Sequence, residues 1–357
     1  MNKGKDNENF LNNQYKTLEA YVPGEQPTDM KYIKLNTNEF PFDPSPYVLK
    51  KVNEEEVRKL NLYPDPKSSA LKTAIAKRYG FNKENVFVSN GSDETLAFYF
   101  MAFCEGGVVF PDITYGFYEV YANLYNLDYK KIPLKDDFSI DINDYIGINK
   151  NIIIANPNAP TGMILSLDEI EKIVSSNKNN LVAIDEAYVD FGAESAVNLV
   201  NKYNNLIVIQ TFSKSRALAG GRLGFAIANE DVIADFEKIK YSTNPYNINR
   251  LTQIAGISAI EDDTYYMDLC KEVIKTREYT KCELEKLGFS VTKSFANFVF
   301  ASHKDFGGEK LYLDLKKNGI LVRHFGTEKI KDYLRITIGK KEDMTFLIET
   351  LKKIIGE

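Results

Sequence analysis

Tryptophan is absent from this sequence, histidine occurs twice and cysteine three times, and each scarcity excludes a kind of chemistry. The two histidines, His303 and His324, are too few for a histidine-based metal cluster and argue against a Ser-His-Asp triad. The three cysteines, Cys104, Cys270 and Cys282, show neither CxxC spacing nor an even-numbered framework. We therefore expect no metal site, no disulfide framework and a reducing compartment.

Long hydrophobic runs and a strong charge imbalance are missing as well. No run of about eighteen apolar residues occurs, and the polar opening MNKGKDNENF contains no apolar signal core. The formal net charge is -5, with acidic and basic residues mixed along the chain, which is not the footprint of a protein that binds nucleic acid or a membrane surface. The sequence thus predicts a cytoplasmic protein whose partners include neither nucleic acid nor a membrane.

Length and an alternation of short apolar strands with helices are the main positive features. The chain has 357 residues, more than one hydrophobic core usually serves. Short, continuously apolar strands separated by helices predict a mostly parallel sheet covered on both faces. We expect such strands at 86–89, 108–110, 152–155, 181–184 and 206–211. Ligands of these sheets bind beyond the carboxyl ends of the strands, where the polar clusters of this chain fall.

After Ala228 the pattern changes to long helices, expected over 231–240 and 249–287 with an interruption near Asp262. Strands with few helices between them follow, which indicates a smaller α+β domain. We therefore predict a division into an N-terminal arm and small-domain segment at 1–35, a large ligand-binding domain at 36–245 and a small C-terminal domain at 246–357.

The stretch from Ile207 to Ala228, IVIQTFSKSRALAGGRLGFAIA, holds the most informative cluster. It predicts a buried strand, a polar turn at Ser213 and Lys214, and a glycine-rich crossing that contains Arg222. An amine that attacks a carbonyl must be partly neutral, a state that a nearby cation and apolar surroundings favour, and a guanidinium grips phosphate through two parallel hydrogen bonds. A pyridoxal phosphate enzyme needs such a lysine beside a phosphate clamp; an ordinary solvated loop is the alternative.

Further polar residues follow other predicted strands. Ser92 and Asp93 open a helix, where free N–H groups and the helix dipole favour an anion, although the same pair is equally a plain N-cap. We expect Tyr115 either to stack flat on an aromatic cofactor or to pack in the hydrophobic core. Asp185 closes an apolar strand, where burial of an aspartate is costly unless it pairs with a cation such as a protonated pyridine nitrogen. Tyr188 offers a phenol to a ring oxygen of the same cofactor.

Motifs along nearly the whole chain resemble the fold-type I pyridoxal phosphate aminotransferases and, within them, the histidinol-phosphate aminotransferase family. They are Tyr21-Val22-Pro23-Gly24, Asn36 to Pro41, Tyr63-Pro64, Gly91-Ser92-Asp93-Glu94, Tyr115, the Pro-Thr-Gly at 160–162, Asp185-Glu186-Ala187-Tyr188, Thr211 to Lys214 with Arg222, and Arg335-Ile336-Thr337. The resemblance implies an aspartate-aminotransferase-like α/β fold, with a three-layer large domain around a mostly parallel central sheet and a smaller α+β domain. It also implies pyridoxal 5'-phosphate as cofactor and transfer of an amino group between L-histidinol phosphate and 2-oxoglutarate in histidine biosynthesis.

The resemblance also implies a role for each matched residue. Lys214 forms the Schiff base with the cofactor, Asp185 holds the pyridine nitrogen and Tyr188 contacts the ring oxygen. The remaining implied cofactor contacts are Tyr115 on the ring, Ser92, Asp93, Ser213 and Arg222 around the phosphate, and Tyr63 at the phosphate of the neighbouring subunit. The implied substrate-binding residues are Tyr21, Asn38, Arg323 and Arg335. Because Tyr63 acts across subunits, the resemblance implies a homodimer.

The chain departs from the family pattern at one position. The family has Asn immediately before Pro-Thr-Gly, donating to the ring oxygen, whereas this chain has Ala159. Asn158, one position earlier, is the expected substitute, although a shift by one residue reverses the side-chain direction on an extended segment.

Two other kinds of function fit parts of the sequence. An aromatic amino-acid aminotransferase or a threonine-phosphate decarboxylase of the same fold would use the same lysine and aspartate, so only the substrate arginines and the Tyr21 segment separate them from the first interpretation. A doubly wound nucleotide-binding protein without covalent chemistry is the alternative of another class. The chain contains neither GxGxxG nor GxxxxGK(S/T), which argues against it.

Overall fold

The computed structural model describes residues 10–16 and 18–356, so residues 1–9 of the predicted N-terminal arm lie outside the described residues. The largest element is a seven-stranded sheet with the strand order β2-β8-β7-β6-β5-β3-β4. Its strands are β2 (Val86–Ser89), β3 (Val108–Pro111), β4 (Tyr129–Ile132), β5 (Asn151–Ala155), β6 (Val182–Asp185), β7 (Leu206–Thr211) and β8 (Gly224–Ala228). Neighbouring strands from β4 to β7 run parallel, whereas β8 runs antiparallel to both β7 and β2. The predicted mostly parallel central sheet is confirmed.

The strands of this sheet are apolar because helices cover both faces. Every residue of β2, β3, β5, β6 and β7 is buried, and alternate residues enter different cores: Ile152 and Ile154 of β5 lie in one, Ile153 in the other. One core is shared with α3 (Ser69–Tyr79), α6 (Leu167–Ser176) and α8 (Arg250–Glu261), and the other with α4 (Ser92–Phe103), α5 (Phe117–Leu124) and α7 (Glu230–Thr243). The large domain is therefore a three-layer α/β structure, as expected.

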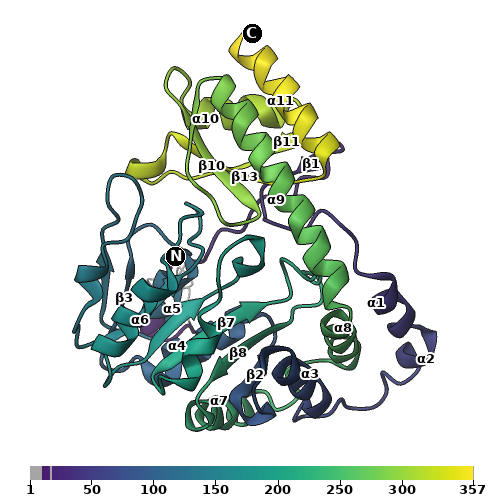
Figure 1. Cartoon of the computed structure of the whole chain (residues 1–357), viewed down its shortest axis with the longest axis vertical. Helices are drawn as coiled ribbons and strands as arrows, with labels where there is room; N and C mark the ends of the chain where they lie inside the picture. Colours follow the sequence, from purple (N-terminus) through teal and green to yellow (C-terminus); the bar gives the residue numbers. More distant parts are fainter. Residues whose placement is uncertain (1–9, 17, 357) are drawn as a thin grey trace, which may run out of the picture.

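The second part of the chain forms a smaller α+β domain, drawn above the large sheet in Figure 1. Its antiparallel sheet has the order β12-β13-β10-β9, and β1 pairs in parallel with β11. The strands are β1 (Ile33–Lys34), β9 (Phe289–Val291), β10 (Phe298–His303), β11 (Ile320–Leu321), β12 (Arg323–His324) and β13 (Tyr333–Thr337), and the helices are α9 (Asp263–Lys286), α10 (Gly308–Lys317) and α11 (Lys341–Ile355). Among the helices that the structure describes, none is long and apolar enough to cross a membrane.

Helix α9 connects the two parts, running from α8 beside the large sheet into the small domain (Figure 1). The helical pattern breaks at Asp262, as the sequence predicts. Ala255, Ala259 and Ile260 of α8 belong to the core of the large sheet, so their packing favours a domain boundary near Asp262 over one after residue 245.

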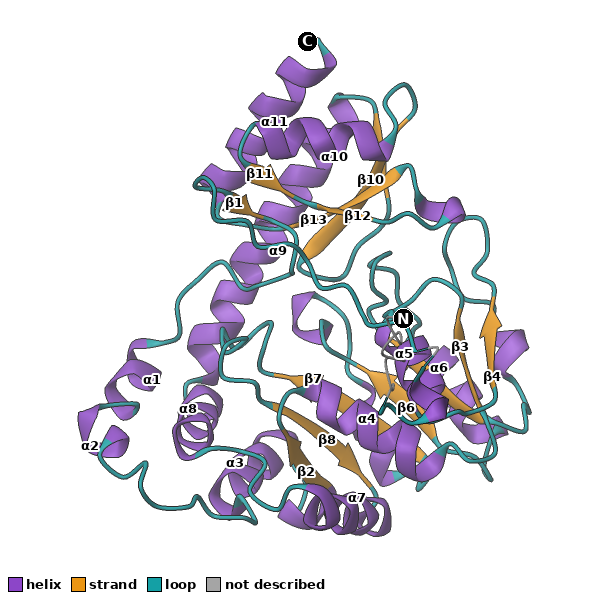
Figure 2. Ribbon diagram, turned by 180° about the vertical axis from the view of Figure 1, so that it is seen from behind, coloured by secondary structure: helices purple, strands orange, loops and turns teal. Residues whose placement is uncertain are grey.

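Short elements in the connections have weaker sequence patterns. Two helices, α1 (Pro46–Lys51) and α2 (Glu54–Val57), lie at the margin of the molecule next to α8 (Figure 2). The 3-10 helices are η1 (Asn13–Tyr15), η2 (Lys83–Asn85), η3 (Ile142–Tyr145), η4 (Val189–Phe191), η5 (Ala196–Asn201) and η6 (Glu328–Ile330).

Candidate active site

A cavity of about 570 Å³ lies where β5, β6 and β7 end, between the large sheet and the small-domain strands β12 and β13. Asp185, the last residue of β6, pairs with Ala155 of β5 and Ile209 of β7, so it stands at the middle of this edge. The predicted site residues that line the cavity are Tyr21, Asn38, Ser92, Asp93, Tyr115, Asp185, Tyr188, Ser213, Lys214, Arg222, Arg323 and Arg335.

One end of the cavity is built for an anion. Helix α4 begins at Ser92, its N-cap is Gly91, and no side chain caps it. Ser92 and Asp93 are thus the first helical residues rather than a plain N-cap, and the N–H groups of a first helical turn favour a negatively charged ligand. Arg222 lies beside this turn, where its Nη2 donates to Asp93 Oδ2 at 2.8 Å.

Two glycines allow the guanidinium and the helix to approach so closely. A Cβ on Gly91 would lie 2.5 Å from Arg222 Nη2, and a Cβ on Gly224 would lie 2.3 Å from the backbone nitrogen of Ser92. Arg222 itself has a φ of 51°, in the left-handed region that few side chains adopt. The close packing places a fixed cation beside the free start of α4.

Lys214 lies in the turn that follows β7. The backbone N–H of Ser213 donates to Thr211 Oγ1 at 3.1 Å, which shapes this turn. The Lys214 ammonium donates to the backbone oxygen of Thr37 at 3.2 Å and lies 5.7 Å from the centroid of the Tyr188 ring. It forms no ion pair with any residue that the structure describes, so its amine points into the cavity without a neutralising carboxylate.

Asp185 is buried, with 4% of its surface exposed. Its Oδ2 accepts a hydrogen bond from the Tyr118 hydroxyl at 2.8 Å, and its Oδ1 accepts one from the backbone N–H of Ala187 at 3.2 Å. Desolvation by burial is the largest influence and raises the pKa of Asp185 to about 6, against the opposing effect of these two donors. Within the described chain it forms no ion pair, so a cationic ligand would relieve the penalty of burying it.

Tyr188 and Tyr115 are fixed by hydrogen bonds rather than free to turn. Asn38 Nδ2 donates to the Tyr188 hydroxyl at 3.0 Å, while Asn38 Oδ1 accepts from Thr337 Oγ1 at 3.0 Å. Because Thr337 ends β13, this chain of contacts joins the small domain to the site. The Tyr115 hydroxyl donates to Asp93 Oδ1 at 2.9 Å, and burial together with the Asp93 charge raises the pKa of Tyr115 well above its ordinary value.

Two arginines lie side by side on the small-domain side of the cavity. Arg323 of β12 is the direct partner of Arg335 in the β12–β13 register. Arg335 Nη2 donates to the backbone oxygen of Asn36 at 3.0 Å, its Nε is buried without a partner, and Arg323 donates to the backbone oxygens of Val22 and Pro23 at 3.3 and 3.4 Å. Neither guanidinium forms an ion pair with a carboxylate in the described part of the chain. Like charges directly opposite on neighbouring strands repel, so this pair is suited to a shared anion.

Asn158 does not line the cavity, although the sequence predicts it as a cofactor contact. Its Nδ2 donates to the backbone oxygen of Ile113 and to Thr161 Oγ1, both at 3.0 Å, and its Oδ1 accepts from Thr114 Oγ1 at 2.9 Å. Ala159 lines the cavity instead. Because Asn158 stands one position earlier than the family's Asn, its amide points away from the cavity and holds the loop around residues 158–161 instead of facing a ligand.

Tyr63 lies outside the cavity of its own chain. Its side chain is 77% exposed, and its ring stacks on Tyr246 with the centroids 4.5 Å apart. A contact between Tyr63 and a cofactor phosphate would therefore have to be made in a second subunit.

Sequence reasoning missed Tyr118 and Thr37. Tyr118 lies three residues after Tyr115, in the first turn of α5, and is fully buried, so its nearness in sequence was the available signal once Tyr115 had been placed beside the site. Thr37 acts through its backbone oxygen, for which a sequence carries no residue-specific signal. Both position charged groups of the cavity, one at Asp185 and one at Lys214.

The strand-end lysine, the buried carboxylate and the anion-binding helix start together define the class of protein. The family model described as aminotransferase class I and II matches residues 30–351, and the chain belongs to this family. It is 56% identical to the histidinol-phosphate aminotransferase of Brachyspira hyodysenteriae, with 97% of this chain and 99% of that protein aligned, and 49% identical to the one of Clostridium botulinum, with 98% and 99% aligned. The crystal structure of the histidinol-phosphate aminotransferase from Clostridium acetobutylicum superposes with a TM-score of 0.83 at 26% identity and covers 90% of this chain and 98% of its own.

Proposed function

We propose that this protein is a pyridoxal phosphate-dependent aminotransferase that moves the amino group of L-histidinol phosphate to 2-oxoglutarate in histidine biosynthesis, in the cytoplasm. The choice of this amino donor rests on the neighbouring pair Arg323 and Arg335. Two guanidiniums match a phosphate dianion better than a single carboxylate, because each can bind it through two parallel hydrogen bonds. The names of the relatives in Brachyspira and Clostridium support the same donor.

The residues of the cavity fit pyridoxal phosphate. The pyridinium nitrogen would give buried Asp185 an ion-pair partner, which none of the described residues provides, and the start of α4, Ser213 and Arg222 would hold the phosphate. Lys214 would bind the cofactor covalently. When bound, the cofactor supplies an electron sink for the reacting carbon of the substrate.

The chain's own residues would then divide the work. The Lys214 amine would carry the proton to and from the substrate carbon, and Asp185 would keep the ring nitrogen charged. Asn38 orients the Tyr188 hydroxyl, which would contact the ring oxygen. Arg323 and Arg335 hold the anionic end of the substrate, so that its amino end points to Lys214.

A parallel assay with three amino compounds tests this function. With 2-oxoglutarate and added cofactor, we expect conversion of histidinol phosphate at a kcat/KM far above that for phenylalanine, and no release of CO2 from threonine phosphate. A preference for phenylalanine would favour the aromatic aminotransferase, and CO2 release the decarboxylase. A purified protein without a near-visible absorption band after incubation with pyridoxal phosphate would exclude all three.

Replacing Arg323 by Ala should weaken the reaction of the phosphorylated donor in particular. A charge-assisted hydrogen bond contributes roughly 1.5–3 kcal/mol, so kcat/KM for histidinol phosphate should fall by about one to two decades. The loss should be much smaller for phenylalanine and 2-oxoglutarate if these rely mainly on Arg335. Steady-state kinetics with histidinol phosphate, phenylalanine and threonine phosphate measure it, with Lys310→Ala as a matched loss of a small-domain cation outside the cavity. Equal losses for all three compounds, or none, would remove the reason for preferring histidinol phosphate.

We further propose a homodimer in which Tyr63 reaches the cofactor phosphate of the neighbouring subunit. The exposed apolar side chains near Tyr63 support a contact surface here; they are Leu49, Val57, Leu60 and Leu62. Sedimentation at micromolar concentration should show a dimer. Tyr63→Phe should weaken cofactor binding about tenfold through loss of one hydrogen bond to a charged group, whereas Tyr241→Phe, another exposed tyrosine, should not. A monomer with full activity would refute the shared site.

A further inference from the structure

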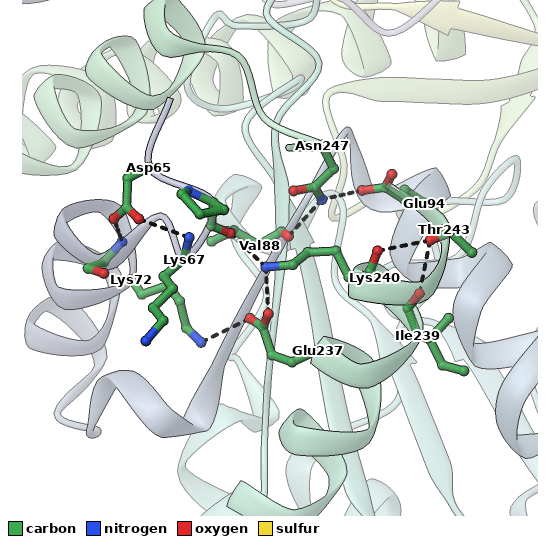
Figure 3. Close-up of polar contacts among 12 residues, drawn as sticks. Asp65, Lys67, Lys72, Val88, Glu94, Glu237, Ile239, Lys240, Thr243 and Asn247 are labelled. Atoms are coloured by element: carbon green, nitrogen blue, oxygen red, sulfur yellow. Dashed lines mark hydrogen bonds and ion pairs between the residues drawn. The ribbon is translucent and has the colours of Figure 1, made fainter. Parts of the chain in front are cut away.

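Lys240, near the end of α7, has a completely buried side chain, which is rare for a lysine. Its Nζ donates to the backbone oxygen of Pro66 at 3.0 Å and pairs with Glu237 Oε2 at 2.5 Å. Glu237 Oε1 in turn pairs with Lys72 of α3 at 3.1 Å (Figure 3). The buried ammonium therefore ties α7 and α3 to one carbonyl of the loop between residues 62 and 68.

That loop is the one that presents Tyr63. Prolines at 64 and 66 restrict its backbone, and Asp65 accepts hydrogen bonds from the backbone N–H groups of Lys67 at 2.9 Å and Ser69 at 2.8 Å (Figure 3). On the other side, the Tyr63 ring stacks on Tyr246. Lys240 bonds the stiff loop to the large domain at Pro66, next to a second bond from Gln253 Nε2 of α8 to the backbone oxygen of Asp65 at 3.1 Å.

The chemistry of this contact favours a role in placing the loop over a role in stabilising the fold. A buried ion pair contributes little net stability compared with apolar side chains of similar volume, and its best-attested use is to specify one arrangement among several. The charged groups that face the Lys240 ammonium are Glu237 from its own helix, Lys72 from α3 and Asp65 from the loop. An apolar residue would fill the space but could not bond the Pro66 oxygen.

We propose that Lys240 is a positioning residue, which holds the Tyr63 loop in the shape that reaches the cofactor phosphate of the neighbouring subunit. The inference rests on the proposed function, and in particular on the dimer with Tyr63 acting across it. A substitution of Lys240 should then weaken cofactor binding in the site of the other subunit, not in the site of the chain that carries the substitution.

A change in α7 also has a path to the cofactor site of its own chain, and the experiment has to separate this path from the effect on the neighbouring subunit. Asn247, just beyond α7, donates to Glu94 Oε2 at 2.6 Å and to the Val88 oxygen at 3.3 Å (Figure 3). Glu94 lies in the first turn of α4, beside the anion-binding end of the cavity. A substitution that merely loosened α7 would disturb the site of its own chain by this route.

The first measurement uses the homodimer. Lys240→Met should weaken the binding of pyridoxal phosphate about tenfold, the same as Tyr63→Phe, as read from titration of the near-visible band of the lysine-linked cofactor. Amide hydrogen exchange in residues 60–68 should become faster. Lys238→Met removes an exposed lysine of the same helix and should change neither quantity. If Lys240→Met alone does not fold, Lys240→Met with Glu237→Gln, which retains a partner for Lys72, gives the same comparison.

Hybrid dimers decide where the effect acts, because Lys214→Ala leaves one site unable to form the covalent link. In the first hybrid, a chain with both Lys214→Ala and Lys240→Met is paired with a wild-type chain. This dimer should bind the cofactor weakly, since the site that retains Lys214 receives its Tyr63 from the altered chain. A Lys214→Ala chain paired with a Lys240→Met chain should bind as tightly as a hybrid of Lys214→Ala and wild type. The reverse pattern, or equal weakening in both hybrids, would overturn the proposal.

The outcomes also separate this inference from the proposed function. A wild-type dimer in which Tyr63→Phe weakens cofactor binding but Lys240→Met does not would contradict only the role of Lys240. A monomeric wild-type protein, or a Tyr63→Phe variant with unchanged affinity, would contradict the shared site and this inference together.

Discussion

Lys214→Ala should lower turnover by several orders of magnitude, because it removes both the covalent link to the cofactor and the proton carrier. Lys214 is the single lysine among the residues that line the cavity in the described chain. Its ammonium donates to the Thr37 backbone oxygen at 3.2 Å. Lys214→Arg keeps the positive charge and should be equally inactive, since a guanidinium cannot serve as the nucleophile.

Borohydride reduction followed by peptide mapping tests the assignment independently of activity. The reduced cofactor should be found on the peptide that contains Lys214, and the label should disappear in Lys214→Ala. Lys178→Ala, which changes an exposed lysine that does not line the cavity, should keep both label and turnover. Label on any other lysine would refute the assignment.

The sequence predicts the regular elements best where burial imposes a pattern. The strands expected at 86–89 and 206–211 have the bounds of β2 and β7. Strand β4 was missed because it has two exposed lysines, Lys130 and Lys131, at the edge of the sheet. Such residues protect an edge strand from pairing with another chain, and they remove the apolar run by which a strand is recognised.

The candidate site was predictable to the extent that it lies at strand ends. Parallel strands bring their carboxyl ends to one edge, so the predicted sheet places Asp185 and Lys214 at the same edge. The Arg323 and Arg335 pair depends on the register of two short antiparallel strands, which no local pattern specifies. The direction of the Asn158 side chain depends on a loop geometry that residue type alone does not determine. These features required the three-dimensional structure.

Asp185→Asn should raise the melting temperature of the cofactor-free protein at pH 7 and lower the kcat of the catalysed reaction. Burial raises the pKa of the Asp185 carboxyl to about 6, above the value of about 3.9 in an unfolded chain. Because the folded state holds this proton more tightly, the contribution of Asp185 to stability is most favourable below about pH 4 and is lost as the pH rises to about 6. Above that window the ionised group lowers the free energy of unfolding by about 3 kcal/mol. The substituted amide carries no charge, so the cofactor-free variant should melt at a higher temperature than the wild type at pH 7 and show no such difference at pH 4.

The same change should lower kcat by about two to three decades, because the ring nitrogen loses the carboxylate that keeps it charged. Glu186 provides the matched control: it is also buried, its pKa is raised to about 7 mainly by desolvation, and it does not line the cavity. Its carboxylate accepts hydrogen bonds from the Ala196 backbone at 2.6 Å and from Gln210 at 2.8 Å. Glu186→Gln should therefore change the pH dependence of melting while kcat stays near that of the wild type. Melting curves of the cofactor-free proteins from pH 4 to 7, with kcat at saturating cofactor, give both quantities. Loss of turnover in Glu186→Gln as large as that in Asp185→Asn would show that burial of a carboxylate, and not its contact with the cofactor, is what the reaction requires at this edge of the sheet.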